Sequence, residues 1–169
     1  MSATPRFISD LHLGHKKILG FAGEHREGSS TDEHDEWIVS RWNETVGKRD
    51  PVFILGDLAF SRAGLERVKS LRGQKFLLLG NHDRFSLPDY EAVGLKIFGF
   101  CKYKGFWLSH APIHPLELRG KPNIHGHVHH NSLPDFRYYN VSVEALAGRP
   151  VSLDQIRQFY EKNPIALPS

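Results

Sequence analysis

The sequence predicts an α/β fold built from two packed sheets, and two features of the chain support this. Up to residue 79, short apolar runs of strand length alternate with longer stretches whose apolar residues recur at helical spacing. Beyond Pro88, the chain has mostly short apolar runs separated by turn residues. An alternating half followed by a β-rich half is typical of two sheets packed together with helices outside.

The predicted elements of the first half follow one another as strand, helical turn, polar surface loop, helix, strand, helix and strand. Their residues are 6–9, 16–21, 22–30, 31–46, 51–55, 65–71 and 76–79. The long helix has the clearest signals, because Ser30 and Glu33 have capping-box spacing at its start and Gly47 follows its end.

Four strands and one helix are predicted for the second half. The strands are at residues 95–103, 105–108, 123–125 and 137–143. The first two form an antiparallel pair with its turn near Lys104 and Gly105. A final amphipathic helix begins after Ser152, whose spacing to Gln155 is that of a second capping box.

Length and composition narrow the class of protein. A chain of 169 residues with 40% hydrophobic residues is expected to form one domain with a substantial core. There is no run of about 18 apolar residues and no apparent secretory signal, so we expect a cytoplasmic protein without a membrane partner.

Cys101 is the single cysteine, which excludes an internal disulfide. The net charge of +3 favours anionic ligands, but the 22 Lys and Arg residues are scattered, so nucleic acid is allowed rather than indicated.

Five apolar runs end in side chains that commonly bind metals or carry out acid–base chemistry. These side chains are Asp10 and His12, Asp57, Asn81 with His82 and Asp83, His110, and His127 with His129. Each motif alone has an ordinary explanation, such as a turn, a helix N-cap or a histidine-rich loop. Because ligands gather beyond the carboxyl ends of strands in α/β sheets, five such ends predict one shared centre.

The residue types in this centre suit a pair of metal ions. Asp10 and His12 are two positions apart, so they lie on the same side of an extended segment, and His127 and His129 repeat this spacing. Mixed carboxylate and imidazole donors suit Mn²⁺, Fe, Zn²⁺ or Ni²⁺ better than Ca²⁺. The two oxygens of Asp57 could bridge two ions. Two such ions can clamp the attacking and leaving oxygens of a phosphoryl displacement and lower the pKa of a shared water.

Several neighbouring residues are expected to assist. His82 is a candidate general acid for the leaving alcohol, with Asp83 orienting and charging it. His15 and Arg84 are candidates for binding the substrate phosphate. His34, in contrast, is expected to lie in solvent.

The order of these motifs resembles that of the calcineurin-like metallophosphoesterase superfamily, in particular its small bacterial and phage-type members. The matching motifs are Asp10-x-His12, Gly56-Asp57, Gly80-Asn81-His82-Asp83, His110 and Gly126-His127-x-His129. They run from residue 10 to residue 129, and none of the expected motifs is absent.

The resemblance implies a four-layer α/β/β/α sandwich with a dimetal site at the strand ends. One metal would be held by Asp10, His12, Asp57 and His129. The other would be held by Asp57, Asn81, His110 and His127. His82 would act as the leaving-group acid or stabilise the transition state, with Asp83 as its partner. Mn²⁺ is the favoured metal.

The resulting functional hypothesis is a dimetal phosphoesterase that uses a metal-bound hydroxide. We favour a phosphodiesterase acting on small diesters such as 2′,3′-cyclic nucleotides. A phosphomonoesterase or a nuclease would use the same ligands, so both stay open. A catalytically inactive scaffold is the alternative of another class. The sequence predicts neither protein partners nor an oligomeric state.

Overall fold

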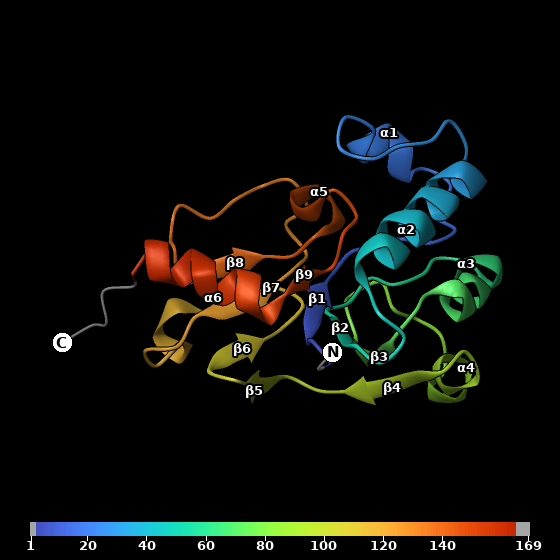
Figure 1. Cartoon of the computed structure of the whole chain (residues 1–169). Helices are drawn as coiled ribbons and strands as arrows, with labels where there is room; N and C mark the ends of the chain where they lie inside the picture. Colours follow the sequence, from blue (N-terminus) through green and yellow to red (C-terminus); the bar gives the residue numbers. More distant parts are fainter. Residues whose placement is uncertain (1–2, 165–169) are drawn as a thin grey trace.

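The computed structural model describes residues 3–164, which form an α/β fold with two mixed sheets (Figure 1). The first sheet has the strand order β4-β3-β2-β1-β9. Its strands are β1 (Arg6–Ile8), β2 (Pro51–Ile54), β3 (Gln74–Leu78), β4 (Leu95–Phe98) and β9 (Val151–Ser152). The first four strands are parallel and β9 is antiparallel to β1, so the carboxyl ends of β1, β2 and β3 share one edge.

The second sheet has the strand order β5-β6-β7-β8. Its strands are β5 (Cys101–Tyr103), β6 (Phe106–Leu108), β7 (Asn123–His125) and β8 (Tyr138–Asn140). β5 and β6 are antiparallel, while β6, β7 and β8 are parallel. The β5–β6 hairpin turns at Lys104 and Gly105, both with positive φ, as two-residue hairpin turns require.

The single strand predicted at residues 95–103 is wrong in one respect, because it divides between the two sheets. β4 pairs with β3 in the first sheet, and β5 pairs with β6 in the second. Gly99 and Phe100 lie between them and belong to neither strand. Periodicity reports that a segment is extended, but it does not report which sheet provides its partner.

Six helices and two 3₁₀ turns lie among residues 3–164. The helices are α1 (Ile18–Ala22), α2 (Thr31–Thr45), α3 (Arg62–Arg67), α4 (Leu87–Ala92), α5 (Val143–Leu146) and α6 (Leu153–Lys162), and the 3₁₀ turns are η1 (Val68–Ser70) and η2 (Pro115–Glu117). At α6, the capping box between Ser152 and Gln155 is complete. At α2, Ser30 accepts the amide of Glu33, but the Glu33 carboxylate pairs with Ser29 instead of Ser30. None of these helices combines the length and the apolar character that crossing a bilayer requires.

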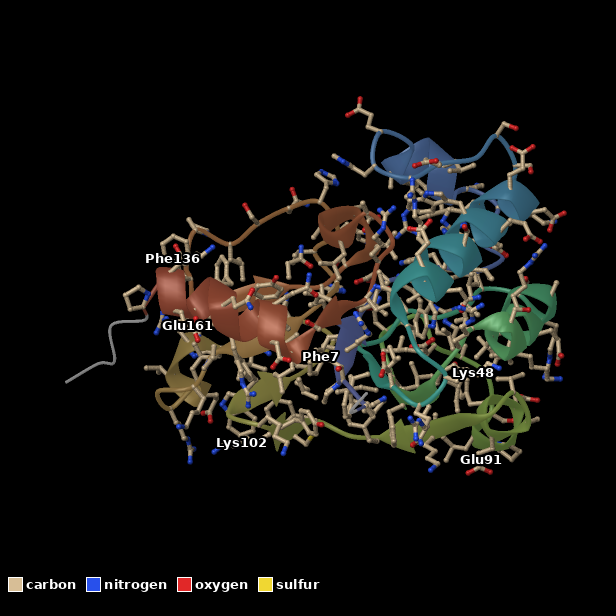
Figure 2. All side chains as sticks on the ribbon, in the orientation of Figure 1. Phe7, Lys48, Glu91, Lys102, Phe136 and Glu161 are labelled. Carbon is tan, nitrogen blue, oxygen red and sulfur yellow. The ribbon has the colours of Figure 1, made fainter. Side chains whose placement is uncertain are left out.

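The first sheet is buried on both faces, which explains its continuous apolar runs. Ile8, Ile54 and Leu77 face a core shared with Ile38 and Trp42 of α2. The alternate positions Phe7, Phe53 and Leu78 face a second core shared with Leu108 and Ile124 of the other sheet. Phe7, labelled in Figure 2, belongs to this second core. This burial fixes the strands whose ends carry the candidate site.

The second sheet presents its two faces to different partners. Phe106 and Tyr139 contact Tyr160 of α6, on the face that also carries Leu108 of the inter-sheet core. On the opposite face, Trp107 donates its indole N–H to the carbonyl oxygen of Leu118 in the loop at 111–122. The α/β class and two mixed sheets are therefore confirmed. The predicted four-layer sandwich also needs helices on the face of the second sheet that carries Trp107. Among residues 3–164, no helical layer is found on that face.

Candidate metal centre

The strand ends of both sheets converge at one place. Asp10 follows β1, Asp57 follows β2, and Asn81 follows β3, whereas His110 follows β6 and His127 follows β7. Among the described residues, two groups have ligand atoms that lie within 4.8 Å of one another: Asp10, His12 and His129, and Asp10, Asp57 and His110. The structure thus brings together Asp and His side chains able to hold a metal.

The backbone is strained at most of these residues. Left-handed φ values occur at Asp10 (60°), His12 (53°), Asp57 (54°), His127 (72°) and His129 (54°). Residues other than glycine seldom adopt this region, and each instance costs of order 1–3 kcal/mol. Such strain clusters at functional sites, because the surrounding structure must hold a side chain where a relaxed backbone would not place it.

Glycines allow the backbone to pass close to the candidate ligands. A Cβ atom on Gly126 would clash with Ser9 Oγ and Asp10 Oδ2. A Cβ atom on Gly80 would clash with Asp57 Oδ1 and the Asp57 amide. Glycine is therefore required at these two positions, because two chain segments approach too closely there to leave room for a side chain.

Buried polar atoms without partners surround His12. Both ring nitrogens of His12 and Oδ1 of Asp10 are buried without a hydrogen bond. His12 Nε2 lies 3.9 Å from Asp10 Oδ1 and 3.8 Å from Asp57 Oδ2, too far for hydrogen bonds. Buried polar groups are normally paired. A cation among these atoms would pair His12 Nε2 and Asp10 Oδ1, so the residues present fit a metal.

The ring of His110 is oriented as a metal ligand requires. Its Nδ1 lies 2.8 Å from the carbonyl oxygen of Leu55, which can only accept, so Nδ1 carries the proton. Nε2 faces Asn81 Oδ1 at 2.8 Å and His127 Nδ1 at 3.1 Å. With Nδ1 bonded to a carbonyl oxygen, Nε2 is the ring nitrogen available to a metal, and fixing the ring through Nδ1 is common for metal-bound histidine.

At Asp10 and His12, electrostatics favour the forms that bind metals. Burial raises the pKa of Asp10, but His12, His110 and the amide of His127 outweigh it and hold the pKa below its usual range. Burial lowers the pKa of His12, which favours the neutral imidazole. An ionised carboxylate and a neutral imidazole are the species that coordinate metals.

His82 and Asp83 lie on the loop after β3, and the structure places them differently. The amide of His82 donates to Asp57 Oδ1 at 2.9 Å, and its exposed ring lies 5.2 Å from the ring of Phe60. The Asp83 carboxylate accepts the amides of Asp57, Leu58 and Gly80. No hydrogen bond joins Asp83 to the His82 ring among residues 3–164. Asp83 thus ties the end of β2 to the end of β3.

His15 and Arg84 occupy different surroundings. The His15 ring stacks on Phe60 at 4.1 Å, and burial together with the neighbouring His12 and His82 lowers its pKa to about 4. His15 lines the same pocket as His12 and His82. Arg84 is exposed and lines a neighbouring pocket with Phe60 and Phe85.

Comparison with known proteins gives a relative that matches over most of the chain. The uncharacterized protein MJ1445 of Methanocaldococcus jannaschii is 32% identical over 171 residues, which cover 94% of this chain and 92% of that protein. The chain belongs to the MJ1445 family. No protein-family model matches it.

Solved structures extend the comparison of this MJ1445-family chain. A protein of unknown function from Aquifex aeolicus, AQ665, has a TM-score of 0.73 and 26% identity, covering 94% of this chain and 100% of that one. The Pseudomonas putida nuclease MPE has a TM-score of 0.53 and 22% identity, covering 74% of this chain and 61% of the nuclease. The likeness to the nuclease concerns the fold.

This member of the MJ1445 family also has a buried network that sequence patterns did not reveal. Glu144 Oε1 lies 2.9 Å from His129 Nδ1 and accepts from Arg26 Nε at 2.8 Å. Arg26 donates further to the carbonyl oxygens of Asp10 and Leu11, at 2.6 and 3.1 Å. Glu144 thereby raises the pKa of His129, while His129 and Arg26 overcome the effect of burial and lower the pKa of Glu144 to about 2.

Two sequence expectations are wrong at this network. The segment at 22–30 is not wholly a polar surface loop, because Arg26 is buried. His34 is also buried instead of solvated, and its Nε2 lies 3.0 Å from an Arg26 nitrogen. Arg26 and Glu144 are 118 positions apart and belong to no motif, so no local signal could have joined them.

Proposed function

We propose that this MJ1445-family chain is a dimetal-dependent phosphoesterase of the calcineurin-like type. The observation that carries the proposal is the set of buried ligand atoms without partners around Asp10, His12 and Asp57. When bound, two divalent ions would activate water and clamp the phosphate oxygens. The chain's own residues would position those ions and the ester.

The ligand assignment rests on the two carboxylate oxygens of Asp57, which face different histidines. Asp57 Oδ2 faces His12 Nε2 at 3.8 Å, while Oδ1 faces His110 Nε2 at 3.6 Å. Asp57 would therefore bridge two sites. One would include Asp10, His12 and His129, and the other Asn81, His110 and His127. Mixed imidazole and oxygen donors support Mn²⁺, with Fe, Zn²⁺ and Ni²⁺ as alternatives.

His82 is the proposed general acid. Its amide is fixed by Asp57, and its exposed ring lines the pocket beside His12 and His129. A proton at this position could be delivered to the leaving oxygen of an ester held between the metals and the pocket. Asp83 would contribute by holding the loop backbone.

Replacement of His82 by Ala is expected to leave the metal content unchanged and to slow turnover. The loss should reach roughly 10²–10⁴-fold for an ester with a poor leaving group and be much smaller for a good one, because only the poor one needs the proton. Turnover across esters of graded leaving-group pKa measures this. His114→Ala, another exposed histidine, is the control. Equal slowing for all esters would argue against the acid role.

The preferred substrate is a small phosphodiester such as a 2′,3′-cyclic nucleotide. Nuclease activity is the second candidate, supported by the fold shared with the P. putida nuclease. A phosphomonoesterase would use the same ligands.

Removal and replacement of metal tests the proposal. Protein stripped with a chelator is expected to hydrolyse neither a chromogenic diester nor the matched monoester. Refilling with Mn²⁺ should restore hydrolysis, with the diester preferred. Preference for the monoester would reassign the substrate class. Bound Mn²⁺ without hydrolysis of either ester or of an oligonucleotide would overturn the enzyme assignment in favour of a scaffold.

A further inference from the structure

A pocket of about 420 Å³ opens beside the candidate metal centre. His12, His129 and His82 are among its lining residues, together with the aromatic rings of His15, Phe21 and Phe60. Because His12 and His129 belong both to the pocket and to the centre, one molecule can occupy both.

The aromatic lining of this pocket includes a series of roughly parallel rings. The His15 ring stacks on Phe60 at 4.1 Å with an interplanar angle of 24°. It lies 6.3 Å from Phe21 with an angle of 22°. Phe21 is 73% exposed, so most of its ring is free to contact a ligand. Parallel rings of this kind accept a flat aromatic group by stacking.

The remaining lining residues favour a nucleobase over a purely apolar group. Asn131 adds an amide at the rim, which can both donate to and accept from the edge of a base. No carboxylate is among the described lining residues, so nothing there repels the phosphate that accompanies a base. Ile18 and Ala22 add apolar side chains to the lining.

We infer that this pocket binds the base of a nucleotide and that the substrates are nucleotide phosphodiesters. The inference rests on the proposed function for the phosphate side of the molecule. The base would stack against Phe21, and its phosphate would reach the centre past His12 and His129. Base–aromatic stacking is tolerant of sequence, so we expect little preference among bases.

Binding of adenosine to the metal-free protein tests the pocket without catalysis. We expect adenosine to bind and ribose not to bind, as followed by isothermal titration calorimetry. Phe21→Leu should weaken adenosine binding about tenfold, the loss that one stacking contact typically causes. Phe21→Tyr should retain it. Phe100→Leu is the matched control, because Phe100 is 55% exposed and stacks on Trp107 in the second sheet.

Kinetics of the Mn²⁺-refilled protein complete the test. Phe21→Leu is expected to raise KM about tenfold for 2′,3′-cyclic AMP with little change in kcat, since uniform binding is lost. It should leave hydrolysis of ribose 2,3-cyclic phosphate unchanged. If esters are hydrolysed but adenosine does not bind, or binds equally well after Phe21→Leu, the pocket assignment alone is overturned. Adenosine binding that depends on Phe21, without hydrolysis of any ester, would overturn the proposed function and leave the pocket standing.

Discussion

Replacement of Asp57 by Asn is expected to abolish metal-dependent hydrolysis and to reduce the content of both metals. The amide keeps the shape of the side chain and can still accept the His82 amide at Oδ1. It loses the negative charge and the second carboxylate oxygen, which faces His12. Removing an outer partner of a metal ligand typically costs about 10–100-fold, so losing a bridging ligand should cost more.

Metal content and thermal stability separate this effect from misfolding. Adding Mn²⁺ should raise the Tm of the wild-type protein, because binding to the folded state alone stabilises it. The Asp57→Asn variant should show little such rise, while its metal-free Tm stays near that of the wild type. Asp154→Asn, the same change at an exposed position of α6, should behave as the wild type. Full turnover in Asp57→Asn would refute the bridging role.

The sequence predicted the parts of this structure that local patterns encode. The capping box at Ser152, the turn at Lys104 and the apolar strands of the first sheet each depend on residues within a few positions of one another. The convergence of five strand ends was also predictable, because parallel strands deliver their carboxyl ends to one edge. Two groups of these side chains do have ligand atoms within 4.8 Å of one another.

What the sequence did not predict depends on distant partners. The division of residues 95–103 between two sheets is decided by β3 and β6, not by the segment itself. The hydrogen bonds of Asp83 to three backbone amides are decided by the approach of β2 to β3. Whether a helix forms a fourth layer depends on which face of the second sheet α6 contacts. The spacing of apolar residues within α6 does not specify that face.

Arg26 shows how such distant contacts support the site. Its guanidinium bonds to the carbonyl oxygens of Asp10 and Leu11, next to the left-handed backbone at Asp10 and His12. It also pairs with Glu144, which orients His129. The buried Arg26 guanidinium therefore holds the strained loop after β1 directly and, through Glu144, the candidate ligand His129 in the loop after β7. The cost of the strained backbone is offset in part by these hydrogen bonds.

Replacement of Arg26 by Met is accordingly expected to destabilise the protein by about 3–5 kcal/mol, because it leaves the buried Glu144 carboxylate without its cation. Urea unfolding of the metal-free protein measures this without a contribution from metal binding. Arg137→Met breaks a more exposed pair with Asp135 and should cost only about 0–1 kcal/mol.

Adding Glu144→Gln to Arg26→Met should recover part of the lost stability, because the unpaired charge is then removed while an oxygen still faces His129 Nδ1. Recovery identifies the unpaired carboxylate as the main cost. If the double variant is instead as unstable as the sum of the two single variants, the carbonyl oxygens of Asp10 and Leu11 would be the partners that matter, and the role of Arg26 would be to hold the strained loop.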